Sequence, residues 1–134
     1  MFKCILSGNA RVKNHYYFMS IISNLVQNAI EASEHSLNPT VILNISAKED
    51  FITITVKDTG TGVAPEHLKH IFSPGFSTKF DPITGDINRG VGLTLVKDLI
   101  DEKFKGTISI DSEYKIGTTF SIKLPRIFLE EEIL

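Results

Sequence analysis

The sequence predicts a two-layer α/β (α+β) sandwich, in which helices cover one face of a mixed, mainly antiparallel sheet. Apolar and polar residues alternate in 41–47, 51–57 and 118–124, as they do in strands with one covered face. Apolar residues recur with helical spacing in 15–34 and 91–104. The chain has 134 residues, 42% of them hydrophobic, which suits one domain with its own core.

The remaining elements follow from local signals. A short strand is expected at 2–6, and 107–112 should form a closing hairpin with 118–124. A helix is expected over 64–72, because Pro65 suits its first turn and Pro74-Gly75 would end it. The segment 73–89 is rich in Gly, Pro, Ser, Thr and Asp and shows little periodicity, which predicts a functional lid.

Composition excludes several classes of protein. A formal net charge of −2 without a run of Lys and Arg argues against binding to nucleic acid. The single Cys4 rules out an internal disulfide and is expected as a small core residue in a reducing compartment. The sequence has neither a long apolar span nor a signal-peptide pattern, so the expected location is cytoplasmic.

Asn24 and Asn28 lie four residues apart and therefore on one face of the helix expected at 15–34. They belong to a hydrophilic stripe along a largely apolar helix, which favours a polar ligand there, although a solvated face would give the same pattern. The stripe consists of Ser20, Ser23, Asn24, Gln27, Asn28, Glu31 and Glu34.

Strand parity makes Asp58 and Thr118 candidates for a binding site. Asp58 continues the side of Ile52, Ile54 and Val56, so its carboxylate should point toward the helix layer, where it needs a partner. Thr118 likewise lies on the side of the last strand that is expected to be buried. The alternatives are an Asp that begins a turn and a Thr chosen for its β-propensity.

Two Gly-x-Gly pairs indicate close backbone approaches. Gly60 and Gly62 would let the chain pass near a flat base, and Gly90 and Gly92 precede a helix whose free amides can bind phosphate oxygens. The second pair is not a dinucleotide-binding fingerprint, because Leu95 stands where that motif needs a small residue.

Taken in order, these motifs resemble the nucleotide-binding boxes of the GHKL superfamily, which includes gyrase-type ATPases, Hsp90 and the MutL proteins. The resemblance is strongest to the ATP-binding catalytic domain of sensor histidine kinases and covers nearly the whole chain. The segment Ser77-Thr78-Lys79 further resembles the lid of the citrate- and dicarboxylate-sensing type. The motifs are Asn24 to Asn28, Asp58-Thr59-Gly60-Thr61-Gly62, Phe72 to Lys79, and Arg89-Gly90-Val91-Gly92-Leu93.

The resemblance implies the Bergerat fold, with ATP and Mg²⁺ as cofactors. It assigns Asp58 to the exocyclic amine of adenine, Thr118 to the network around it, and Asn28 to Mg²⁺. Asn24 would help to hold the triphosphate and its ion; it stands where ATP-hydrolysing relatives have a Glu general base, and an amide cannot accept a proton from water. Lys79 and Arg89 flank the lid and could neutralise charge on the β- and γ-phosphates, although a solvated surface cation is the alternative for each. The expected catalytic set is Asn24, Asn28 and Lys79. The implied nucleotide-binding residues are Asn24, Asn28, Glu31, Asp58, Gly60, Gly62, Lys79, Arg89, Gly90, Val91, Gly92, Leu93 and Thr118.

One departure concerns the lid. Asn88 stands where the family commonly has another Gly, which weakens the assignment of the lid hinge and its phosphate contact.

The histidine acceptor of such a kinase is expected on another domain, since His15, His35, His67 and His70 all lack the setting of a phosphorylated His. Residues 1–134 would then be the single catalytic domain, a C-terminal fragment of a larger sensor kinase, with a lid at 73–89. It would serve a response regulator indirectly, and the parent protein would be free to carry a membrane anchor. Two alternatives are a protein-serine kinase of the anti-sigma-factor type and a non-catalytic, nucleotide-gated interaction module.

Overall fold

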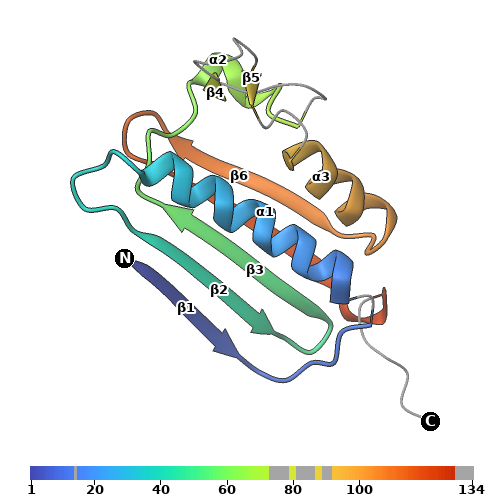
Figure 1. Ribbon diagram of the computed structural model, residues 1–134. Coiled ribbons are helices and arrows are strands. Elements are labelled where there is room, and N and C mark those ends of the chain that lie inside the picture. The colour runs from blue at the N-terminus through green and yellow to red at the C-terminus, as the bar shows by residue number, and fades with distance from the viewer. Residues whose placement is uncertain (14, 73–78, 81–86, 89–91, 129–134) are drawn as a thin grey trace.

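The computed structural model describes residues 1–13, 15–72, 79–80, 87–88 and 92–128 of the chain (Figure 1). Its main sheet is mixed and has the strand order β1-β2-β3-β7-β6. β1 runs parallel to β2, and the other neighbours are antiparallel. The five strands are β1 (Phe2–Ser7), β2 (Val41–Ala47), β3 (Phe51–Asp58), β6 (Thr107–Glu113) and β7 (Gly117–Pro125).

Two helices, α1 (His15–Ser33) and α3 (Gly92–Glu102), cover one face of this sheet (Figure 1). α1 supplies the crossover that the parallel pair of β1 and β2 requires. The short helix α2 (Pro65–Leu68) lies beyond the end of β3, and a 3₁₀ turn (Arg126–Phe128) follows β7. The predicted two-layer fold class is confirmed.

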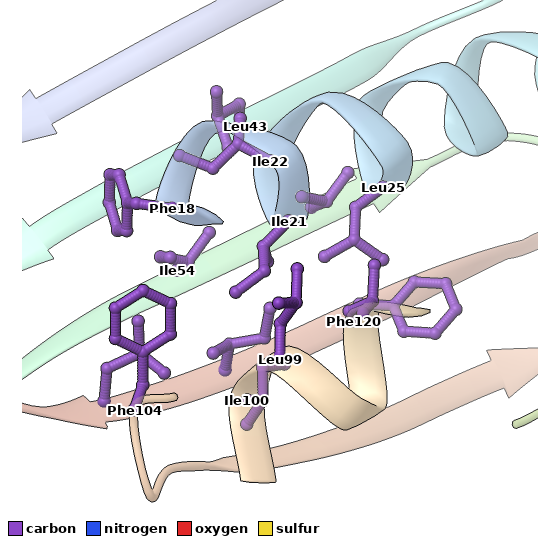
Figure 2. Packing of buried hydrophobic residues seen from close by; sticks show 14 of the residues in the cluster. Phe18, Ile21, Ile22, Leu25, Leu43, Ile54, Leu99, Ile100, Phe104 and Phe120 are labelled. Carbon is purple, nitrogen blue, oxygen red and sulfur yellow. The ribbon is translucent and has the colours of Figure 1, made fainter. Parts of the chain in front are cut away.

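The core lies between this helix layer and the sheet (Figure 2). It forms because one stripe of α1 and one face of each central strand are apolar, so that their burial removes hydrocarbon from water. Among its side chains, Ile21, Leu25, Ile54, Val96 and Phe104 have 0% exposure. Further members from α1, the sheet and α3 are Phe18, Ile22, Ala29, Leu43, Val56, Phe120, Leu99 and Ile100.

The helix expected at 64–72 is shorter in the structure and spans only Pro65–Leu68. The backbone N–H of His70 donates to the carbonyl of His67 (2.9 Å), which closes the helix as a tight turn. Ile71 then enters the core with 3% exposure, so the chain leaves the helical path to bury it.

The proposed lid falls largely outside the described residues. Within it the structure places the strands β4 (Lys79–Phe80) and β5 (Ile87–Asn88), which pair antiparallel with Lys79 opposite Asn88. Residues 73–78, 81–86 and 89–91, to which the sequence assigns parts of the lid and of the phosphate site, lie outside the described part of the chain.

The prediction that Cys4 is a core residue was wrong, because the structure exposes it. Cys4 pairs with Leu43 and shares its face of the sheet, yet β1 is an edge strand whose six residues are all exposed. The apolar side of α1 is likewise wider than its covered face, since Met19 remains 53% exposed and Ile30 47% exposed. Residue type alone therefore does not show how far the helix layer covers the sheet.

Candidate nucleotide-binding site

Three polar side chains form a row across three neighbouring strands on the helix-covered face. Asp58 at the end of β3 is in register with Thr118 of β7, which is in register with Ser112 of β6. Asp58 is 5% exposed and Thr118 7% exposed. Buried polar groups need partners, so this row indicates either an internal network or a ligand site at the edge of the core.

Asp58 is held by main-chain donors. The N–H of Gly60 donates to Asp58 Oδ1 at 2.8 Å. Burial raises the pKa of this carboxyl above its usual range, while hydrogen bonds from the backbone of Gly60 and Thr118 act in the opposite direction. The carboxylate is therefore oriented before any ligand arrives, and a donor offered by a ligand would relieve part of the burial penalty.

The glycines around Asp58 lie too close to other backbone segments to carry a side chain. A Cβ on Gly60 would lie 2.5 Å from the carbonyl oxygen of Ala32 in α1, and a Cβ on Gly117 would lie 2.2 Å from the carbonyl oxygen of Asp58. Gly62 has φ of +70°, a conformation that favours glycine. These contacts fix the end of α1, the end of β3 and the start of β7 together around Asp58.

α1 brings Asn24 to the side that faces the start of α3. Asn24 Nδ2 donates to the carbonyl of Ser20 (2.7 Å), which leaves Asn24 Oδ1 to point away from its own helix. A Cβ on Gly92, the first residue of α3, would lie 3.3 Å from Asn24 Oδ1. Asn24 and Asn28 are both half-buried and lie one turn apart. The structure thus brings the amide of Asn24 to the start of α3, with Asn28 one turn further along the same helix.

The other predicted site residues are placed as follows. Glu31 is half-buried one turn beyond Asn28, and its Oε1 accepts a hydrogen bond from Gln27 Nε2 at 3.0 Å. Leu93 is half-buried and packs against the core. Arg89, Gly90 and Val91 lie outside the described residues, and Lys79 is described for its backbone alone.

The start of α3 is also tied to the segment after α2. Thr94 Oγ1 donates to the carbonyl of Phe72 at 3.1 Å. The ring of Phe72 packs edge-on against Phe120, with centroids 6.4 Å apart and an interplanar angle of 66°. Phe72 therefore acts as a packing anchor beside the site.

Two residues of the site were not among those predicted. Thr59 Oγ1 accepts a hydrogen bond from the N–H of Thr40 (3.0 Å) and joins the loop after α1 to the end of β3. Ser112 Oγ accepts from the N–H of Val63 (2.7 Å) and lies 2.9 Å from Thr118 Oγ1. Strand parity applied to 107–112 would have placed Ser112 on the covered face, but the contact with Val63 spans 49 positions of sequence.

The oxygen donors of the site suit a hard cation held jointly with a ligand. Within the described residues, no three His, Cys, Asp or Glu side chains gather in a group that could hold a metal ion. The amide oxygens on α1 are hard ligands of the kind Mg²⁺ prefers, and Mg²⁺ usually takes one or two protein oxygens and completes its shell with phosphate and water. The donor set therefore fits a magnesium ion that arrives with a phosphorylated ligand.

A hollow on the opposite, uncovered face of the sheet has a volume of about 340 Å³. It is lined by Ile5, Lys48 and the small polar side chains of Ser7, Asn44, Ser46, Thr53 and Thr55. By strand parity these residues point away from Asp58, so the hollow does not belong to the candidate site.

Comparison with known proteins identifies the class to which this fold and site belong. Residues 15–127 match the model of the family described as histidine kinase-, DNA gyrase B-, and HSP90-like ATPases. The chain therefore belongs to this ATPase family. Among its relatives it resembles sensor histidine kinases, and it corresponds to their ATP-binding catalytic domain.

Two curated relatives illustrate this similarity. The chain is 40% identical over 108 residues to a probable C4-dicarboxylate sensor kinase of Halalkalibacterium halodurans, a match that covers 79% of this chain and 19% of the relative. It is 32% identical over 124 residues to the sensor histidine kinase GlnK of Bacillus subtilis, covering 92% and 29%. The chain thus spans less than a third of the length of these relatives.

Solved structures show the same fold. The catalytic domain of histidine kinase ThkA superimposes with a TM-score of 0.71 at 25% identity, covering 92% of this chain and 78% of that one. The mycobacterial sensor histidine kinase MprB gives a TM-score of 0.74 at 19% identity, covering 92% and 80%. Full-length ShkA in complex with AMPPNP gives a TM-score of 0.74 at 23% identity, covering 99% and 27%.

In the described residues no helix is both long and apolar enough to cross a membrane.

Proposed function

We propose that this chain binds ATP together with Mg²⁺ and directs the γ-phosphoryl group to a histidine on a separate helical hairpin domain, which then serves a response regulator. The observation that carries the proposal is the buried row of Asp58 and Thr118 at one end of α1, with the amides of Asn24 and Asn28 further along the same helix. Full-length ShkA, part of which shares this fold, was solved in complex with AMPPNP, an analogue of ATP.

Adenine would bind at the Asp58 end. A carboxylate only accepts hydrogen bonds, so a buried one selects a base that offers a donor, and the exocyclic amine of adenine is such a donor. The missing Cβ of Gly60 lets the loop after Asp58 approach Ala32 of α1, and the backbone of Gly60 and Gly62 would pass close to the base.

The phosphates would lie between α1 and α3. Asn24 Oδ1 and the carboxamide of Asn28 would hold Mg²⁺, which when bound draws charge from the β- and γ-phosphate oxygens. The first amides of α3, beginning at Gly92, lack partners within their own helix and would donate to phosphate oxygens. Lys79, Arg89, Gly90, Val91 and Leu93 complete the proposed set.

Asn24 favours transfer over hydrolysis. A carboxamide cannot remove a proton from water, and Asn24 already donates its N–H to Ser20. The γ-phosphoryl group would therefore persist until an acceptor with its own nucleophilic nitrogen is positioned in line. Phosphoryl transfer depends mainly on positioning and charge stabilisation, which these groups supply.

The test uses the chain with γ-labelled ATP and Mg²⁺, in the presence and absence of the phosphoacceptor hairpin of the C4-dicarboxylate sensor kinase relative. We expect ATP binding without self-labelling or rapid hydrolysis, and weak, acid-labile labelling of the added hairpin. The labelling is expected to be weak because untethered partners lack a high effective concentration.

Two controls complete the test. A hairpin whose phosphoacceptor His is replaced by Gln should take no label, and Asn28→Ala should abolish labelling through loss of a magnesium ligand. Strong self-labelling on any of the four histidines, or acid-stable label on a serine, would contradict the proposal and favour a different kinase class.

A further inference from the structure

The hydroxyl of Ser112 connects three parts of the candidate site. It accepts a hydrogen bond from the N–H of Val63 (2.7 Å), can donate to the carbonyl of Gly117 (3.2 Å), and lies closer to Thr118 Oγ1 (2.9 Å), where either hydroxyl can be the donor. Ser112 is half-buried and sits on the covered face of β6, beside Thr118. No neighbouring side chain other than Thr118 shares this hydroxyl among the described residues.

The accounting of protons at Ser112 leaves two arrangements. A serine hydroxyl has one proton and two lone pairs, and Val63 occupies one lone pair. If Ser112 donates to Gly117, Thr118 must donate to Ser112, and Thr118 then offers only lone pairs to a ligand. If Ser112 donates to Thr118, the proton of Thr118 is free to be donated outward.

Adenine requires the second arrangement. Its exocyclic amine is a donor and the adjacent ring nitrogen N1 is an acceptor, whereas guanine reverses both groups at these positions. Asp58 can meet only the donor, so a complete match to adenine needs Thr118 to donate toward N1, directly or through a water molecule.

We propose that Ser112 is a positioning residue for adenine recognition: by donating to Thr118 Oγ1, it turns the Thr118 proton toward the N1 edge of the base. This inference rests on the proposed binding of ATP and adds a residue that reads the base without contacting it. Ser112 at the same time holds Val63, so the loop that follows Gly62 and the hydroxyl of Thr118 are oriented by one side chain.

The test compares ATP with 1-deaza-ATP, in which a C–H group replaces N1, by titration calorimetry with Mg²⁺. The wild-type chain should prefer ATP over 1-deaza-ATP by roughly three- to tenfold, the net effect of one neutral hydrogen bond. Ser112→Ala should reduce this preference, because the Thr118 hydroxyl loses the contact that holds its proton toward N1. Ser112→Thr keeps the hydroxyl and should restore the preference.

Two matched variants separate positioning from a general structural role. Ser109→Ala removes an exposed hydroxyl from the same strand and should leave the preference for ATP unchanged. In a Thr118→Val background, Ser112→Ala should have no further effect on the preference, since the two residues act through one proton. A purely structural role would lower the affinity for both nucleotides equally or only lower the stability.

The possible outcomes distinguish this inference from the proposed function. An unchanged preference in Ser112→Ala, or equal additional loss in the Thr118→Val background, would overturn the inference and leave ATP binding intact. A wild-type chain that binds neither nucleotide would overturn the proposed function, and this inference with it.

Discussion

Replacement of Asp58 by Asn is the most direct test of how this site reads its base. The substitution keeps the size of the side chain and retains an oxygen to accept the N–H of Gly60, which lies 2.8 Å from Asp58 Oδ1. The second carboxylate oxygen becomes an NH₂ group, so a donor would face the exocyclic amine of adenine.

The expected loss is large because Asp58 is only 5% exposed, so water cannot readily take over the lost contact. A hydrogen bond to a charged group contributes about 1.5–3 kcal/mol, which corresponds to a roughly ten- to 150-fold rise in the Kd for ATP. Guanine presents a carbonyl where adenine presents its amine, so the new NH₂ group should bind GTP better than the wild type does. The ratio of the ATP affinity to the GTP affinity should therefore fall by a larger factor than the ATP affinity itself.

Titration calorimetry with both nucleotides and Mg²⁺ measures this change. Asp111→Asn is the matched control, because Asp111 is exposed on β6 and by parity points to the uncovered face. Unchanged ATP affinity in Asp58→Asn, or equal affinities for ATP and GTP in the wild type, would refute the assignment of Asp58.

Two further predictions concern stability and the glycines. Because burial raises the pKa of Asp58 in the folded state, its contribution to stability is fully present below the unfolded pKa and is lost as the pH rises through the folded pKa. Urea unfolding from about pH 3 to 8 should therefore show a decline in the wild type that Asp58→Asn lacks, and parallel curves would contradict this reasoning. Gly60→Ala should destabilise by about 1–3 kcal/mol, since its Cβ would lie 2.5 Å from the backbone oxygen of Ala32. Gly92→Ala meets only the side-chain oxygen of Asn24 at 3.3 Å, so it should weaken ATP binding and leave the urea midpoint nearly unchanged; equal effects of the two variants on stability would count against this distinction.

Much of the fold was predictable because its signals are local. The alternation in β2 and β3 gave both strands to within one residue, and the alternation in β3 and β7 placed Asp58 and Thr118 on the covered face. The helical spacing of apolar residues gave α1 nearly in full. Such patterns can be read from sequence because burial of one face imposes the period of the element on the chain.

The features that could not be predicted depend on which elements become neighbours. The exposure of Cys4 follows from the position of β1 at the sheet edge, beyond the cover of α1, and no property of residues 2–6 encodes that position. The role of Ser112 requires Val63 to lie beside the turn between β6 and β7. The roles of Asn24, Asn28 and the other assigned residues remain predictions that the binding experiments test.

The packing of α1 links the stability of the domain to the geometry of the proposed transfer. Leu25 has 0% exposure and Asn24 precedes it directly, so the position of Leu25 in the core sets the direction of the Asn24 amide. In the last turn of the same helix lies Ala32, against which Gly60 fixes the loop after Asp58. One rigid helix therefore sets the separation between the group expected to read adenine and the groups expected to hold the phosphates. Because interiors are densely packed and tolerate little displacement, a small shift of α1 would change both ends of the site together.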